Sequence, residues 1–167
     1  IPNFLYTDHT HLANVYYPAF NIKKLYPKKW IALEKSVYAN TSINFTMSSH
    51  VSRSMKEHYE CPEEKIKNVY VGSNSAITHE NFNDSRYSRQ NILFLGVAWK
   101  RKGGPQLIEA FKIVRRSLPN ATLTIVGCSP NIEVENCTII GRVPLTEVNQ
   151  YYGKASVFCL PTRQEPF

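Results

Sequence analysis

The sequence predicts an α/β fold built from two doubly wound parallel sheets, in which short apolar strands alternate with helices. Two observations lead to this prediction. From residue 91 onward, apolar runs alternate with stretches whose apolar residues recur at spacings of three and four. Between residues 72 and 90 the apolar pattern lapses into polar residues, which predicts a boundary between two domains.

The first half of the chain is the more polar. Strands are expected at residues 3–7, 43–47 and 66–71, with a helix over residues 29–38. A second helix is expected after Ser48, a residue type that caps helix N-termini. The apolar residues that indicate the two helices are Trp30, Leu33, Val37 and Tyr38 in the first, and Val51, Met55 and Tyr59 in the second.

The second half alternates more cleanly. The expected strands are residues 92–96, 123–127, 138–141 and 156–160. A helix over residues 105–118 begins with Pro105, which suits a first helical turn, and another helix is expected over residues 145–154. Continuous apolar strands separated by helices are typical of a doubly wound sheet, in which ligands bind at the carboxyl ends of the strands.

Composition excludes several classes of protein. The chain is 43% hydrophobic and 20% charged, which excludes a disordered protein, and no apolar run approaches the roughly 18 residues of a transmembrane helix. Its four cysteines are far apart, so neither a zinc ribbon nor a redox pair is expected. Widely spaced cysteines favour a reducing compartment, the cytoplasm.

The basic residues point to one candidate binding site. The net charge is +7, from 20 Lys and Arg against 13 Asp and Glu, and most of it is scattered. One triplet, Lys100-Arg101-Lys102, precedes Gly103 and Gly104, between an expected strand end and an expected helix start. Free backbone N–H groups and the helix dipole attract phosphate at such a turn. The alternative is a solvated basic turn whose glycines serve only its geometry.

Two further blocks follow expected strands. Glu165 comes shortly after residues 156–160, where it is either a surface residue or part of a site at the same sheet edge as the basic turn. His9 and His11 follow residues 3–7, where one of them lines a cleft or both lie in an exposed loop. One residue between them places the two histidines on opposite sides of an extended chain, so no shared metal is expected.

Taken in order, these blocks resemble family 4 glycosyltransferases of the group 1 type, which have the GT-B fold. The resemblance rests on residues 94–96, 101–104 with the helix that follows, 123–127, 141–143, 151–152 and 156–167, and upstream on residues 48–59, 62–66 and 69–74. It implies two Rossmann-like doubly wound domains, both incomplete in this chain. Residues 1–75 would be the C-terminal part of the acceptor-side domain, 76–90 a linker, and 91–167 the first part of the donor-binding domain. Such a central fragment is expected to be inactive alone.

The resemblance also implies roles for residues of the donor side. Lys102 would hold the diphosphate of a nucleotide sugar, with Arg101 and Gly103 beside it. The backbone around Arg142 and Val143 would border the nucleobase.

Other roles are implied for the transferred sugar. Glu165 would contact it, and His9 would face it, with His11 as a competitor for that role. The sequence departs from the family at Val97, where an Arg is frequent, so one phosphate contact is either absent or supplied by Lys100 or Arg101. The family's second glutamate would lie beyond Phe167.

The implied activity is retaining transfer of a hexose-type sugar from a nucleotide diphosphate sugar to a glycan or a lipid-linked acceptor, with no metal or other cofactor. One alternative is a non-catalytic nucleotide- or phosphate-binding module. Another is a basic nucleic-acid binder, which is disfavoured because the ten tyrosines are dispersed rather than aligned with the basic triplet. A third hypothesis is peripheral contact with the inner face of a membrane through the lysines at positions 23, 24, 28 and 29 around Tyr26 and Trp30.

Overall fold

The computed structural model describes residues 1–18, 20–72, 84–163 and 165. The described chain divides into two compact units. The first comprises Ile1–Gly72 and Glu165, and the second comprises residues 84–163. Of the linker expected at residues 76–90, residues 76–83 lie outside the described ranges. The next residues, Asp84–Arg89, form the 3-10 helix η4.

The first unit holds a sheet of three parallel strands in the order β1-β2-β3. The strands are β1 (Phe4–Thr7), β2 (Ile43–Thr46) and β3 (Ile66–Asn68). The helices are α1 (Lys28–Asn40) and α2 (Ser49–Tyr59), with the 3-10 helices η1 (His11–Tyr16), η2 (Ile22–Lys24) and η3 (Glu63–Lys65). The expected cap of α2 is confirmed, because the Ser48 side chain accepts a hydrogen bond from the Val51 N–H.

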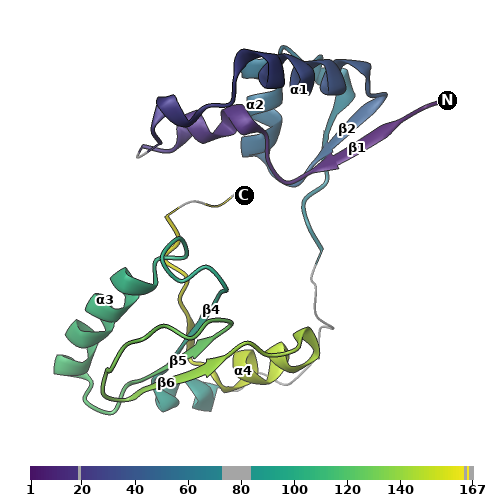
Figure 1. Cartoon of the computed structure of the whole chain (residues 1–167). Helices are drawn as coiled ribbons and strands as arrows, with labels where there is room; N and C mark the ends of the chain where they lie inside the picture. The colour runs from purple at the N-terminus through teal and green to yellow at the C-terminus, as the bar shows by residue number, and fades with distance from the viewer. Residues whose placement is uncertain (19, 73–83, 164, 166–167) are drawn as a thin grey trace. The chain divides into compact units, whose positions relative to one another are not determined.

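Helices α1 and α2 pack on the same face of this sheet (Figure 1). The core that they share contains Tyr38, Val51, Met55, Tyr59 and Cys61, with Leu5 and Ile66 of the strands packed against it. Because side chains alternate along a strand, Phe4 and Tyr6 point to the other face, and both are more than half exposed.

The second unit holds a sheet of four parallel strands in the order β6-β5-β4-β7. The strands are β4 (Asn91–Leu95), β5 (Thr122–Val126), β6 (Cys137–Gly141) and β7 (Val157–Phe158). The helices are α3 (Gly104–Ser117) and α4 (Val148–Lys154), the latter preceded by the 3-10 helix η5 (Leu145–Glu147). Within the described ranges, no helix combines the length and apolar character needed to cross a bilayer.

The order of these strands is that of the first half of a Rossmann fold. The chain builds outward from β4 through β5 to β6, then returns to place β7 on the other side of β4. The direction of winding therefore reverses between β4 and β7. In open parallel sheets, ligands bind outside the carboxyl ends of the strands at such a switch point.

Helices cover both faces of the second sheet. Phe94 packs with Leu107 and Phe111 on the α3 face, whereas its neighbour Leu93 packs with Ala155 and Tyr151 on the α4 face. Figure 1 shows α3 and α4 on opposite sides of this sheet. The fold class predicted from the sequence, two Rossmann-like parallel α/β units, is confirmed.

Two strands are shorter than the sequence predicts by three residues each. β3 ends at Asn68 instead of residue 71, because Tyr70 takes a left-handed conformation with φ 58° that ends the extended chain. β7 holds only Val157 and Phe158 of the expected residues 156–160, and it pairs with β4 alone. Beyond it the chain reaches Pro161, which has no N–H to continue a ladder.

Candidate functional site

The loop between β4 and α3 is a tight turn at the switch point. Its backbone is closed by hydrogen bonds from the Lys102 N–H to the Ala98 carbonyl at 2.9 Å and from the Gly104 N–H to the Trp99 carbonyl at 2.9 Å. Gly103 caps α3 with φ 77°, in the left-handed region that favours glycine. The loop therefore has one well-defined conformation.

Gly96 allows the Lys102 side chain to lie across the end of β4. A Cβ added at Gly96 would come within 3.2 Å of Lys102 Cγ, which is tighter than ordinary contact. Lys102 is half-buried, while its neighbours Lys100 and Arg101 are exposed. The aliphatic stem of Lys102 is thus held against the strand end, and this fixes where its ammonium group can reach.

Backbone donors at the start of α3 are fewer than the sequence predicted. The Gly103 N–H donates to the Lys100 carbonyl at 3.3 Å, and the Gly104 N–H donates to Trp99. Pro105 has no N–H. The loop consequently offers positive side chains more than free backbone groups, and the contribution of Gly103 is its conformation.

A second loop, which follows β7, docks on the first. The Arg163 N–H donates to the Arg101 carbonyl at 3.0 Å, and Thr162 Oγ1 donates to the same carbonyl at 3.4 Å. A Cβ on Gly103 would lie 1.8 Å from the Pro161 carbonyl oxygen, so only glycine permits this approach. The docking brings the backbone of Arg163, a residue that the sequence analysis missed, beside that of Arg101.

The expected nucleobase residues follow β6, two strands from β4. Gly127 and Gly141 both have positive φ, and the Gly127 N–H donates to the Gly141 carbonyl at 2.7 Å. After this closed turn, Arg142 is exposed, whereas Val143 is half-buried and packs against the core on the α4 face. Arg142 therefore lies at the same carboxyl edge as Lys102, about 10 Å away by the usual spacing of strands.

The structure does not bring all the predicted site residues into one unit. Arg101, Lys102, Gly103, Arg142 and Val143 belong to the second unit. Glu165 is grouped with the first unit, where its backbone carbonyl accepts a hydrogen bond from the Tyr17 hydroxyl. His9 also belongs to the first unit.

His9 lies just past the carboxyl end of β1. The Thr7 hydroxyl donates to the His9 carbonyl at 2.7 Å and fixes the turn. His9 Nδ1 is buried and makes no hydrogen bond to the described residues. In the first turn of α2, His50 Nε2 is likewise buried without a partner in the described chain, and burial lowers the pKa of His50, with His9 and Arg53 adding to the effect. Sequence periodicity gave no signal for His50.

His11, by contrast, is held by structural contacts. Its ring stacks on Tyr26 with 3.7 Å between centroids, and its Nε2 accepts a hydrogen bond from the Tyr26 N–H at 2.8 Å. Its backbone N–H donates to the Glu34 carboxylate at 3.0 Å. Burial lowers the pKa of His11, an effect that Glu34 opposes and His9 reinforces. An accepting Nε2 requires that this nitrogen be unprotonated.

The first unit should lose stability as the pH falls below about 6.5, the ordinary histidine value. Burial lowers the pKa of His11, His50 and His58, so the unfolded chain binds protons that the folded unit resists. The contribution of these histidines to the free energy of unfolding is complete above their ordinary pKa. It is lost as the pH falls through their lowered pKa values in the folded unit. Urea unfolding measures the free energy of unfolding at about pH 7.5 and at about pH 5.5, and the difference is the loss. Both pH values are above the range in which carboxylates titrate.

The control is the same pair of measurements on the variant His11→Gln. It removes one of the three groups and should reduce the pH dependence without abolishing it. A first unit that becomes more stable between the higher and the lower pH would contradict the expectation.

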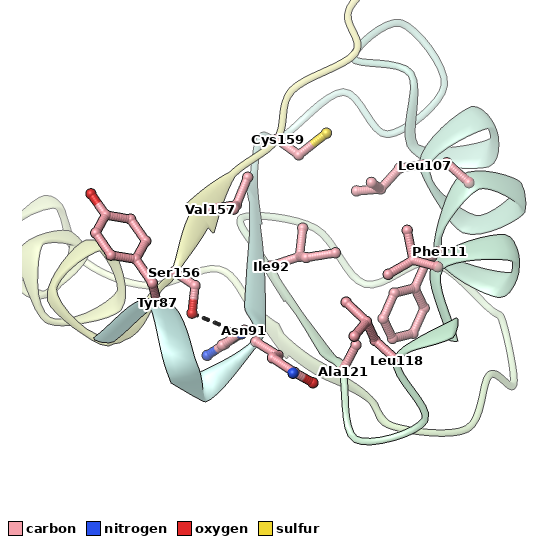
Figure 2. A pocket seen from close by; sticks show the side chains of 13 residues that line it. Tyr87, Asn91, Ile92, Leu107, Phe111, Leu118, Ala121, Ser156, Val157 and Cys159 are labelled. Carbon is pink, nitrogen blue, oxygen red and sulfur yellow. Dashed lines mark hydrogen bonds between the residues drawn. The ribbon is translucent and has the colours of Figure 1, made fainter. Parts of the chain in front are cut away.

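A cavity of about 480 Å³ lies in the second unit between α3 and the edge formed by β4 and β7 (Figure 2). Figure 2 shows Leu107 and Phe111 on one side of it and Ile92 and Val157 on the other. None of its lining residues is charged, so the cavity does not suit a diphosphate. Separately, the described residues include no cluster of three or more His, Cys, Asp or Glu side chains that could hold a metal ion.

The second unit is therefore an open parallel α/β unit with two docked loops at its switch point, the place where proteins of this architecture bind their ligands. Residues 89–167 match the family described as glycosyl transferases group 1. The resemblance to group 1 glycosyltransferases that the sequence indicated is confirmed over these residues.

A comparison of structures agrees with this match. Sucrose-phosphate synthase from Thermosynechococcus elongatus is similar to 98% of the chain with a TM-score of 0.65, at 17% sequence identity. At this identity the likeness establishes the fold alone, and the chain spans 45% of the length of that protein. A search of curated proteins gives no significant match.

Proposed function

We propose that this chain is part of a retaining glycosyltransferase that moves a hexose-type sugar from a nucleotide diphosphate sugar to a glycan or lipid-linked acceptor. The observation that carries the proposal is the pair of docked loops at the switch point between β4 and β7, with Lys102 held across Gly96. The family match over residues 89–167 supports sugar transfer in general.

Lys102 is the proposed partner of the diphosphate. Breaking the anomeric bond develops negative charge on the leaving diphosphate and positive charge on the sugar. A cation fixed beside the phosphates stabilises this separated charge more than it stabilises the bound donor, and therefore lowers the barrier. The contact of the Lys102 stem with Gly96 supports such a fixed position, because the side chain does not have to be ordered when the donor binds.

Arg101 and Arg163 are proposed to add charge beside Lys102. Both are exposed, and their backbones are joined by the hydrogen bond from Arg163 to Arg101. Arg163 is therefore a further candidate for the phosphate contact that an Arg at position 97 would make and that Val97 cannot. Arg142 and Val143 are proposed to border the nucleobase, in line with their place after β6, two strands from β4.

Glu165 and His9 are proposed to contact the transferred sugar. The structural contacts of His11 favour His9 for this role, because His11 Nε2 is already used by the Tyr26 N–H. His9 lies at the carboxyl edge of the first sheet and has a buried ring nitrogen with no partner in the described chain. A sugar hydroxyl would complete its hydrogen bonding.

The location proposed for the enzyme is the cytoplasm, in agreement with its four free cysteines.

The test is a transfer assay on the complete protein with a panel of nucleotide sugars and acceptors. We expect one nucleotide sugar to be consumed in the presence of acceptor, and the product to keep the anomeric configuration of the donor, which NMR measures directly. Inversion of the anomeric centre would refute the retaining mechanism, and the absence of transfer from every donor would refute the enzyme.

The second candidate function is a module that binds a nucleotide or phosphate without catalysis. The docked basic loops favour such a module as much as they favour the enzyme, because they lie in the second unit and do not depend on His9 or Glu165. Calorimetry with nucleoside diphosphates separates the two candidates. Binding together with transfer supports the enzyme, whereas binding without transfer by the complete protein supports the module.

A further inference from the structure

Helix α1 carries apolar residues on its exposed side as well as on its buried side. Ile31 and Tyr38 pack toward the core of the first unit. Trp30, Leu33 and Val37, at positions i, i+3 and i+7, form a stripe on another side of the helix, roughly 120° around its axis, and they are between 45% and 53% exposed. Solvent-facing helix positions are normally polar, so a continuous exposed stripe marks a surface for interaction.

The segment just before α1 also exposes apolar residues. Ile22 in η2 and Tyr26 in the following turn are 71% and 59% exposed. We name the whole region the η2–α1 surface. Its apolar members are Ile22, Tyr26, Trp30, Leu33 and Val37.

Lysines flank these apolar residues. Lys23, Lys24, Lys28 and Lys29 are all exposed, and they lie between and beside Ile22, Tyr26 and Trp30 along the chain. The one carboxylate between residues 20 and 40 is Glu34, which points inward and accepts hydrogen bonds from the His11 N–H and the Tyr38 hydroxyl. The η2–α1 surface is therefore apolar and positive, with no acidic side chain of its own directed to solvent.

We propose that the η2–α1 surface binds the face of an anionic lipid bilayer. Aromatic and aliphatic side chains can enter the boundary between headgroups and acyl chains, while the four lysines contact anionic headgroups. A nucleic acid would use the lysines and leave Leu33 and Val37 without a role. This proposal goes beyond sugar transfer and does not depend on it, because lipid binding is measured without donor or acceptor.

The experiment is sedimentation of the protein with two kinds of vesicle, phosphatidylcholine alone and phosphatidylcholine with about one third phosphatidylserine. We expect binding to the anionic vesicles only, weakened by added salt because surface charges are screened. In the double variant Lys28→Glu and Lys29→Glu, affinity should fall roughly 30-fold or more, since each lysine near such a surface contributes about a factor of five. Trp30→Ser should weaken binding roughly tenfold while leaving its salt dependence in place.

The matched control is on α3 of the second unit. Ile113 is 62% exposed and has exposed basic neighbours in Lys112 and Arg116, but it belongs to no exposed apolar stripe. Ile113→Ser and Arg116→Glu should leave vesicle binding unchanged. All the substituted side chains are exposed, so folding, checked by circular dichroism and thermal unfolding, should be maintained.

Several outcomes would overturn the proposal. Equal binding to both kinds of vesicle would show that the lysines do not contribute to binding. If the control variants lost as much vesicle affinity as the variants of the η2–α1 surface, this surface would not be the binding site. If the protein ignores vesicles but self-associates in a way that Leu33→Ser abolishes, the η2–α1 surface contacts protein instead of lipid.

Discussion

If Lys102 holds the diphosphate as proposed, we expect Lys102→Met to lower the rate of sugar transfer by roughly a hundredfold or more, the usual effect of removing one electrostatic partner of the transition state. Methionine keeps an aliphatic stem that can pack over Gly96, so the variant removes the charge and little else. The loss should fall mainly on kcat, because the leaving diphosphate gains charge only as the bond breaks. Steady-state kinetics of the complete protein measures both kcat and KM.

The control for this result is Lys112→Met, on the exposed side of α3. Lys112 pairs with Glu109 at 2.8 Å on the surface of the same unit, so its replacement removes one positive charge away from the switch point. Transfer and donor affinity should stay within about twofold of the original, as surface pairs contribute little. Unchanged kinetics in the Lys102 variant, or equal losses in both, would exclude Lys102 from the site.

The position of Lys102 could be predicted from sequence because it depends on local structure. An apolar run followed by a basic turn, two glycines and Pro105 predicts a strand end and a helix start, and these are where β4 ends and α3 begins. Arg163 could not be found in this way. Its place beside Arg101 results from β7 pairing with β4, a contact between residues far apart in the sequence. Apolar spacing carries no information about which strands become neighbours.

The exposed stripe of α1 shows a second limit of periodicity. Trp30, Leu33 and Val37 indicated a helix, and the helix is present as Lys28–Asn40. Tyr38, the fourth residue of that pattern, faces the core together with Ile31, whereas Trp30, Leu33 and Val37 are about half exposed. A helix with apolar residues on two sides has no single apolar face to orient it. Hydrogen bonds to Glu34 from the Tyr59 hydroxyl of α2 and from the His11 N–H favour the observed orientation, and pattern reading does not detect them.

The 3-10 helix η1 was also missed. Leu12, Val15 and Tyr16 have the spacing of a helix, but six residues are too short a stretch for periodicity alone to indicate one, and no element was predicted there. In the structure Thr10 caps η1 by accepting a hydrogen bond from the Ala13 N–H, and the Leu12 N–H donates to the Tyr59 hydroxyl. Thr10, a residue type that caps helix N-termini, was a further local signal for this helix. The contact with Tyr59 is tertiary, and it places His11 against Glu34.

Replacing Gly103 with Ala should disrupt the fold at the switch point and donor binding together. The left-handed conformation costs a residue with a Cβ about 1–2 kcal/mol. The added Cβ would also lie 1.8 Å from the Pro161 carbonyl oxygen, so the two loops must separate. We expect the second unit to lose at least about 2 kcal/mol and its Tm to fall by roughly 8 °C or more. Fluorescence of Trp99, which packs on Phe94 and Gly104, reports this unfolding.

Gly72→Ala is the matched control, because a Cβ at Gly72 would meet no atom within 4 Å. It should leave the Tm and donor affinity nearly unchanged. The comparison with Lys102→Met then distinguishes a loss of folded structure from a loss of charge in the site. The Lys102 variant should keep its Tm and lose rate, whereas the Gly103 variant should lose Tm and bind nucleoside diphosphate at least tenfold more weakly, since separated loops no longer hold Arg101 beside Arg163. If Gly103→Ala lowered the Tm but left diphosphate affinity intact, the docked loops would be only structural, and the binding site would have to lie elsewhere.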